Sequence, residues 1–193
     1  MYPSSIQKLI EQFQVLPSVG PKTAEQYAFA LKKLSKEQIT QLAKALLELN
    51  ALSACTLCNA LTDAKGLCIT CADQQRKRTV LMVLESEPDM ESIEKTKRYP
   101  GLYYLLGEIN EQALKGLVSR VNEAKPPVTE VVLAFDVTPQ MELTLFEIKQ
   151  AFKLAKLDGI KISRLGRGLP TGADLRYADT QTLLGALQHR ETL

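Results

Sequence analysis

The sequence predicts an α/β protein with an all-α module at its N-terminus and a mostly parallel sheet that carries helices on both faces. Three observations support this fold class. Residues 4–50 have helical periodicity, residues 79–163 alternate short apolar runs with helical stretches, and the four cysteines of the chain lie between these regions. With 193 residues and 45% hydrophobic content, the chain is long enough to bury a core in more than one folding unit.

The N-terminal module is expected to consist of helices that each bury one face. One apolar stripe has the i, i+3, i+4, i+7 spacing of a buried helix face: Ala24, Tyr27, Ala28 and Leu31. A second stripe repeats that spacing: Ile39, Leu42, Ala43 and Leu46. Ser35 and Gln38 stand three positions apart just before the second stripe, which is the pattern of a capping box and predicts a helix start.

A tight turn is expected within residues 16–24, between the first two helices. We expect Gly20 to adopt unusual backbone angles and Pro21 to open the next helix. The free amide groups of that helix N-terminus, with Lys22 beside them, attract an anionic oxygen such as that of a phosphate without reading any base. The same spacing also suits an ordinary helical hairpin, so the turn alone leaves both interpretations open.

The four cysteines form two CxxC pairs separated by nine residues: Cys55 and Cys58, then Cys68 and Cys71. This spacing predicts one structural Zn²⁺, because two tight knuckles present four thiolates at tetrahedral geometry and leave no open ligand position. Two disulfides or four unrelated buried thiols are the alternatives, and the confinement of all four cysteines to one short stretch disfavours them. The N-terminal residues lack the apolar core of a secretory signal, so we expect reduced thiols and a cytoplasmic protein.

The second half of the chain is expected to form the sheet. Four short apolar runs are separated by helical stretches: 79–84, 102–105, 128–135 and 160–163. The third run is apolar throughout its centre, as in a strand that helices cover on both faces. Thr138 and Pro139 then start a helix, whose expected buried stripe is Leu145, Ile148, Phe152 and Ala155.

Acidic residues follow the first and third of these runs, where ligands bind in open α/β sheets. Glu85 and Asp89 follow the first run, and Asp136 and Glu142 follow the third. Facing carboxylates at neighbouring strand ends can hold Mg²⁺. The alternative, which has the greater weight, is that these acids only interact favourably with helix dipoles.

Basic residues cluster just after the cysteines, at Arg76, Lys77 and Arg78. They are candidates for lining a DNA channel, with a solvated basic face as the alternative. The formal net charge of +2 does not itself indicate a nucleic-acid binder, because phosphate binding depends on local clustering of charge.

The order of these parts resembles the RecR family of bacterial recombination mediators. The resemblance covers nearly the whole chain and is most specific in LPSVGPKTAEQYAFAL at 16–31, in the cysteine array, and in SRLGRGLPTGADLRYADTQTLLGAL at 163–187. It implies four parts: a helix-hairpin-helix DNA-binding module at 1–54, a four-cysteine zinc finger at 55–72, a TOPRIM domain at 78–172, and a C-terminal ring-assembly segment at 173–193.

The resemblance also implies a function. Proteins of this family look like non-enzymatic DNA clamps that assemble into dimeric or tetrameric rings. They act with RecO and RecF in recombinational DNA repair to place RecA on gapped or single-stranded DNA. By this resemblance Gly20 and Lys22 face DNA, Glu85 and Asp89 belong to an acidic surface that contacts RecO, and the protein is associated with the bacterial nucleoid.

The sequence departs from the family pattern in the DNA-binding module and in one loop. Ser18 takes the place of the first of two hairpin glycines, and Gln26 stands where the family tends to have an arginine. Both changes predict weaker DNA binding by each subunit, because the turn then depends on a serine and the module relies on lysines alone. Residues 101–108 run almost directly into the next helix, so the longer glycine-containing loop of the family is missing.

Two other functions remain as alternatives. TOPRIM enzymes such as topoisomerases bind Mg²⁺ with a glutamate and an acidic DxD cluster, for which Glu85 and Asp136 would qualify. The second aspartate is replaced by Thr138 and the next acidic position by Gln140, so this ligand set is incomplete. A zinc-stabilised module that binds only proteins is the third hypothesis, and it is compatible with the small net charge.

Overall fold

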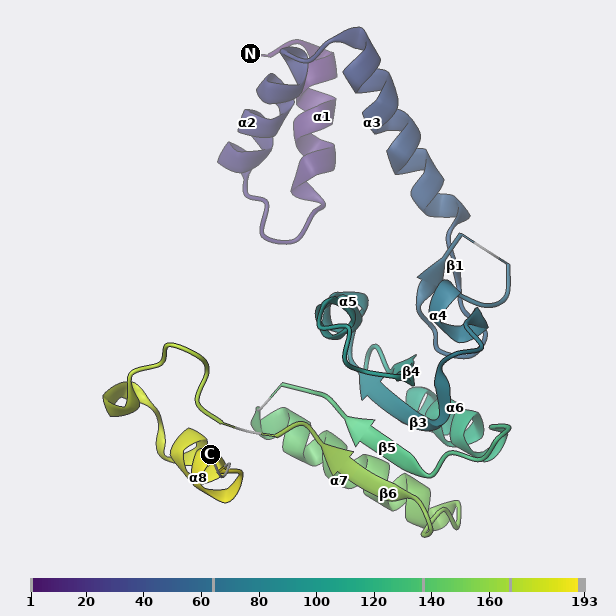
Figure 1. Cartoon of the computed structure of the whole chain (residues 1–193). Coiled ribbons are helices and arrows are strands. Elements are labelled where there is room, and N and C mark those ends of the chain that lie inside the picture. Colours follow the sequence, from purple (N-terminus) through teal and green to yellow (C-terminus); the bar gives the residue numbers. More distant parts are fainter. Residues whose placement is uncertain (1, 64, 137, 167, 191–193) are drawn as a thin grey trace. The chain divides into compact units, whose positions relative to one another are not determined.

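The computed structural model describes residues 2–63, 65–136, 138–166 and 168–190, and Figure 1 shows the whole chain. The chain divides into two compact units, Met1–Leu52 and Ser53–Leu193. The first unit contains the predicted helical module, and the second contains the cysteines and the sheet.

The N-terminal unit is helical, as the sequence predicts. Its elements are α1 (Ser4–Gln14), α2 (Pro21–Lys32), α3 (Lys36–Glu48) and the 3-10 turn η1 (Leu49–Ala51). Helices α1 and α2 pack against each other, and Ala24 and Ala28 of α2 are fully buried. Such small residues let two helix backbones approach closely.

The capping box at the start of α3 is confirmed. The Ser35 hydroxyl accepts a hydrogen bond from the Gln38 amide at 3.3 Å, and the Ser35 amide donates one to the Gln38 side chain at 2.9 Å. These bonds satisfy two of the amide donors that a helix start otherwise leaves unpaired.

The apolar face predicted for α3 is present but exposed, so its expected burial is wrong. Leu46 is 58% exposed, and the stripe lines an open groove of about 580 Å³ together with residues of α1 and α2. Tyr27 of the first stripe is also 47% exposed. Helical periodicity identifies which residues share a face, but burial requires a partner surface, and the described part of this unit supplies close packing only between α1 and α2.

The second unit contains a four-stranded parallel sheet in the order β4-β3-β5-β6. The strands are β3 (Lys77–Leu84), β4 (Gly101–Leu105), β5 (Glu130–Leu133) and β6 (Lys161–Arg164). Each overlaps one of the four predicted apolar runs. In the central pair of strands Leu81 is level with Val131 and Val83 with Leu133.

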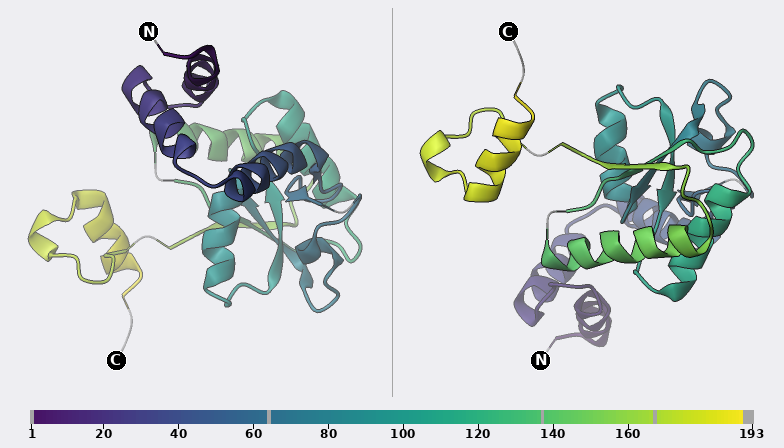
Figure 2. Two further views of the ribbon diagram at one scale, coloured as in Figure 1. Left: turned by 90° about the horizontal axis from the view of Figure 1, so that it is seen from above. Right: turned by 90° about the horizontal axis from the view of Figure 1, so that it is seen from below.

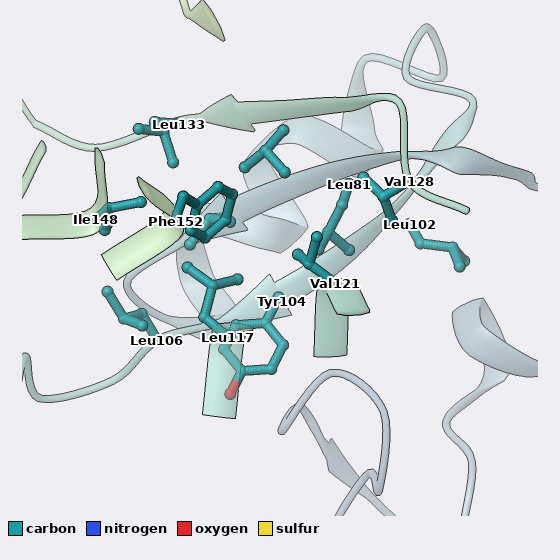
Figure 3. Close-up of a cluster of buried hydrophobic side chains, with 12 residues drawn as sticks. Leu81, Leu102, Tyr104, Leu106, Leu117, Val121, Val128, Leu133, Ile148 and Phe152 are labelled. Carbon is teal, nitrogen blue, oxygen red and sulfur yellow. The ribbon is translucent and has the colours of Figure 1, made fainter. Parts of the chain in front are cut away.

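Helices α6 (Glu111–Asn122) and α7 (Pro139–Leu154) cover one face of this sheet. Helix α7 begins after the predicted cap Thr138, and two further views show it lying along the sheet (Figure 2). Leu117 of α6 and Ile148 of α7 are fully buried. Figure 3 shows the cluster they join: Leu81, Val83, Leu102, Tyr104, Leu106, Leu117, Val121, Val128, Val131, Leu133, Ile148 and Phe152.

The opposite face is covered by α5 (Glu87–Lys95) and by the cysteine segment, which we define as residues 53–72. The cysteine segment contains β1 (Ser53–Ala54), β2 (Leu61–Thr62) and the short helix α4 (Ile69–Ala72). Its four cysteines pack against Met82, Leu84, Tyr103 and Leu105 of the two adjacent strands. The cysteine segment is therefore part of the second layer on the sheet.

The chain ends in the 3-10 turn η2 (Leu175–Tyr177) and helix α8 (Thr180–Gln188). Asp179 caps α8 by accepting a hydrogen bond from the Thr182 amide at 3.0 Å. Among the described residues, no helix has both the length and the apolar character needed to cross a membrane.

Candidate functional site

The four cysteines are brought together in a geometry that suits a metal ion. Their sulfur atoms all lie within 4.8 Å of one another, and Cys58 Sγ and Cys68 Sγ are 3.5 Å apart. A tetrahedral Zn²⁺ with Zn–S bonds of about 2.3 Å requires sulfur atoms roughly 3.8 Å apart. The four side chains are buried. This donor set fits a four-coordinate metal with no ligand position left for a substrate.

Without a cation, two of these thiols are held in their protonated form, whereas the pKa of Cys55, against the effect of its burial, is lowered by hydrogen bonds from backbone amides. A hydrogen bond with Cys71, together with burial, raises the pKa of Cys58, and burial raises the pKa of Cys68. Burial has this effect because it disfavours the charged thiolate. A cation at the centre of the cluster supplies the missing positive charge, so its binding releases protons and weakens as the pH falls.

Main-chain and side-chain hydrogen bonds join the cysteine segment to the sheet. The Leu105 amide at the end of β4 donates to the Cys58 carbonyl at 2.8 Å, and the Asn59 side-chain amide donates to the Leu105 carbonyl at 3.0 Å. Asn59 has a positive φ of 65°, a conformation that asparagine tolerates better than most residues. Arg78 on β3 reaches the Cys71 carbonyl at 3.4 Å. The four cysteines are thus held directly against both a central and an edge strand.

Arg76, a predicted DNA contact, forms an ion pair inside the fold. Its guanidinium donates to both Glu94 oxygens, at 2.8 and 2.5 Å, and its side chain is only 17% exposed. The Tyr103 hydroxyl also donates to Glu94, and the guanidinium lies 5.9 Å from the Tyr103 ring centre. Hydrogen bonding to Glu94 raises the pKa of Arg76, and the same bond lowers the pKa of Glu94. The charge of Arg76 is therefore compensated by α5, whereas the neighbouring Lys77 is exposed.

Neither Glu94 nor Tyr103 stands out in the sequence. Both lie in ordinary helix and strand patterns. The pairing of β3 with β4 brings Tyr103 next to Arg76, and the packing of α5 on the sheet brings Glu94 there. A glutamate on the inner side of an amphipathic helix was the one local signal available, since such a residue needs a partner when it is buried.

In the turn before α2, the unusual backbone conformation falls on a different residue from the one predicted. Ser18 has a φ of 64°, whereas Gly20 has φ −79° and ψ 171°, which any residue can adopt. The expectation for Gly20 was therefore wrong. A Cβ atom added to Gly20 would meet no other atom within 4 Å. Nothing in this unit's described residues requires a glycine at position 20.

Replacing Ser18 with glycine is expected to stabilise the N-terminal unit. A non-glycine residue at positive φ costs about 1 kcal/mol, and glycine removes that cost, partly offset by the entropy glycine gains on unfolding. Thermal unfolding followed by circular dichroism measures the change. Val19→Gly, one position along in the same turn, is the matched control and should destabilise. A lower melting temperature for Ser18→Gly would contradict the strain assigned to Ser18.

The acidic residues at the strand ends do come together, but Asp89 already has a structural role as part of a helix cap. Glu85, Asp89 and Asp136 line a cavity of about 190 Å³. Asp89 accepts hydrogen bonds from the Ser86 amide at 3.1 Å and hydroxyl at 2.7 Å, which caps α5. Thr138, in the place of the enzyme family's second aspartate, caps α7 through the Met141 amide at 3.2 Å. The side chain of Gln140 lies outside the described residues.

The chain matches known protein families along most of its length. Residues 6–50 match the family model described as RecR, helix-hairpin-helix, residues 79–166 match the Toprim domain, and residues 168–191 match RecR, C-terminal. The recombination protein RecR of Streptococcus thermophilus is 38% identical over 203 aligned positions, with 100% of each chain covered. Its counterparts in Streptococcus sanguinis and Streptococcus gordonii are 36% and 35% identical, also over the full length of both chains. The chain therefore belongs to the RecR family of recombination proteins.

Proposed function

We propose that this protein is a non-enzymatic DNA clamp in recombinational repair, which acts with RecO and RecF to help load RecA on gapped or single-stranded DNA. The observation that best supports a DNA contact is the conformation of the turn at Gly20. A glycine that the fold itself does not require leaves room for a close approach of another backbone.

The surroundings of Gly20 suit a phosphate group. Helix α2 begins directly after it, has no side-chain cap from the described residues, and has the exposed Lys22 in its first turn. Uncapped amide groups and a lysine at a helix N-terminus attract an anionic oxygen. In the second unit the exposed Lys77 is the better candidate for a further phosphate contact, because Arg76 is paired within the fold and Arg78 reaches main-chain carbonyl groups.

Gly20→Ala tests this assignment, since it is expected to weaken DNA binding without loss of stability. The added methyl group meets nothing in the free protein but occupies the space that a phosphate needs. We expect an affinity loss of about tenfold, comparable to the loss of one or two hydrogen bonds to a charged group. Fluorescence anisotropy with single-stranded and gapped DNA over a salt series measures it, with thermal unfolding as the stability check.

Three outcomes of this measurement separate the candidate functions. Salt-sensitive binding to DNA that is recovered intact supports the clamp. Cleaved or relinked DNA in the presence of Mg²⁺ supports the alternative of a TOPRIM enzyme. Negligible binding at low salt supports a module that contacts only proteins, and unchanged binding by Gly20→Ala places the contact elsewhere.

The absence of catalysis is supported by the chemistry at the strand ends. Thr138 provides no carboxylate where a DxD cluster requires one, and its hydroxyl caps α7. Glu85 and Asp136 alone would bind Mg²⁺ weakly. We assign Glu85 and Asp89 instead to the acidic surface that contacts RecO.

The metal and self-association belong to the same proposal. Four buried thiolates without an open position favour a structural Zn²⁺ that holds the cysteine segment on the sheet. The exposed apolar stripe of α3 supports assembly of the chain into a dimer or a tetrameric ring, because exposed apolar patches commonly mark such interfaces.

A further inference from the structure

The outward face of α2 combines basic and aromatic side chains in one line. Four exposed residues occur at the i, i+4, i+7, i+11 spacing of a single helix face, and we call them the α2 stripe: Lys22, Gln26, Phe29 and Lys33. Ala24 and Ala28 point to the other side of the helix, where they are buried. The α2 stripe therefore faces away from the α1 contact along its whole length.

Tyr2 extends the aromatic surface at the middle of the α2 stripe. Its ring centre lies 5.2 Å from that of Phe29, with an angle of 73° between the two planes. The Tyr2 hydroxyl donates a hydrogen bond to Glu25 of α2, which holds the ring beside the stripe. Phe29 is 39% exposed and Tyr2 46% exposed. Two adjoining rings are thus fixed in place with part of each open to solvent.

The lysines on either side of these rings can hold a phosphate backbone. Lys22 in the first turn of α2 and Lys33, the residue directly after its last turn, are eleven positions apart, which corresponds to about 16 Å along the helix axis. Residues 1–52 contain six lysines and four glutamates with no other charged side chain, so the formal net charge of +2 of the whole chain is located in this unit. A basic track with an aromatic ring between its cations has the chemistry of a single-strand binding surface.

We propose that the α2 stripe binds single-stranded nucleic acid, with phosphates at Lys22 and Lys33 and an unpaired base stacked on the Phe29–Tyr2 pair. This inference rests on the proposed function, to which it adds a basis for preferring single strands. In a duplex each base is already stacked between its neighbours and paired, so its face is not available to an aromatic side chain. The lysines alone would contact both forms of DNA.

Two probes of equal length separate the effect of base stacking from that of charge: an oligothymidylate and an abasic oligonucleotide. The affinity of the protein for each is measured by fluorescence anisotropy at the same salt concentration. The two probes carry the same phosphates, and only the first carries bases. We expect the protein to bind the oligothymidylate at least about fivefold more tightly than the abasic probe, which is the gain in affinity that one stacked base provides. Phe29→Leu, which keeps an apolar side chain but loses the aromatic face, should remove most of this preference and leave the abasic affinity unchanged.

Tyr27→Leu is the matched control, because Tyr27 is also exposed on α2, at 47%, but packs against Phe13 away from the stripe. It should keep the preference. Tyr2→Leu provides a second variant if Phe29→Leu unfolds, and it should reduce the preference in the same direction. Lys33→Gln should lower the slope of log affinity against log salt by about 0.7, whereas Lys8→Gln on α1 should leave it unchanged.

The result that would contradict the DNA-binding function differs from the results that would contradict the stacking role. If the protein binds neither probe, the DNA-binding function itself is contradicted. Equal affinity for the two probes overturns the stacking role alone, and so does a preference that survives in both Phe29→Leu and Tyr2→Leu.

Discussion

Cys58→Ser is expected to abolish metal binding and to destabilise the whole second unit. Cys58 contributes a buried sulfur to the four-cysteine cluster, and its carbonyl accepts a hydrogen bond from the Leu105 amide at 2.8 Å at the end of β4. Loss of the metal leaves the cysteine segment without its central cross-link and uncovers the part of the sheet face that this segment covers beside α5. Because metal binding and local folding are one event, we expect a loss of about 3 kcal/mol or more and a melting temperature lower by roughly 10 °C.

Metal analysis and calorimetry of the purified variant measure these effects, with Thr56→Ser as the control. Thr56 is exposed in the same segment and is not a ligand, so this substitution should change neither metal content nor melting. Amide hydrogen exchange should show faster exchange in β4 and α5 of Cys58→Ser, whereas α1 and α2 should exchange as before. A variant with the metal content and melting temperature of the original protein would refute the metal site.

Glu94→Gln is expected to give the second largest loss of stability, of about 2 to 3 kcal/mol. The substitution removes the negative charge that compensates Arg76, whose side chain is 17% exposed, and weakens the bond from the Tyr103 hydroxyl. The guanidinium cannot release its proton, so it would remain poorly solvated, with only the longer ion pair to Asp73 at 3.7 Å to compensate its charge. Denaturant unfolding measures the change in the free energy of unfolding.

Glu91→Gln on the same helix is the matched control. Glu91 pairs with Lys95 at 3.8 Å, with both side chains more than 60% exposed, so its loss should cost less than about 0.5 kcal/mol. If Glu94→Gln costs no more than this control, the Arg76 cluster does not stabilise the fold.

The Glu94 carboxylate should also contribute to the pH dependence of stability. Hydrogen bonding to Arg76 lowers the pKa of Glu94 below its ordinary value of 4.5. Its contribution is therefore fully present above the unfolded-state value and is lost as the pH falls through the lower folded-state value. Glu94→Gln should lack this part of the acid destabilisation, whereas Glu91→Gln should retain it.

The sequence was most informative where a local pattern determines local structure. The four apolar runs became the four strands, and the pairs Ser35–Gln38 and Thr138–Pro139 begin helices as predicted. These features depend on residues within one or two turns of each other. The spacing of the cysteines belongs to the same class, because each CxxC pair forms its own turn.

Features that depend on distant partners could not be predicted in this way. In the sequence Arg76 is part of a basic cluster, and only the pairing of β3 with β4 and the packing of α5 on the sheet bring Tyr103 and Glu94 to it. The apolar stripe of α3 is correct in its spacing, but spacing does not show whether a second surface covers it. The turn is a different case, because the positive φ falls on Ser18, which takes the place of the first hairpin glycine of the family pattern, and not on Gly20.

The position of the cysteine segment in the chain has a consequence for biosynthesis. All four ligands precede β3 in the sequence, so they leave the ribosome before any strand of the four-stranded sheet. Metal binding needs only these residues 55–71, whereas the parallel sheet requires pairing between segments far apart in the sequence, which is slow. A cysteine segment that has bound the proposed metal can thus be ready as a surface on which β3 and β4 assemble, and we expect metal supply during translation to influence how fast the nascent chain matures.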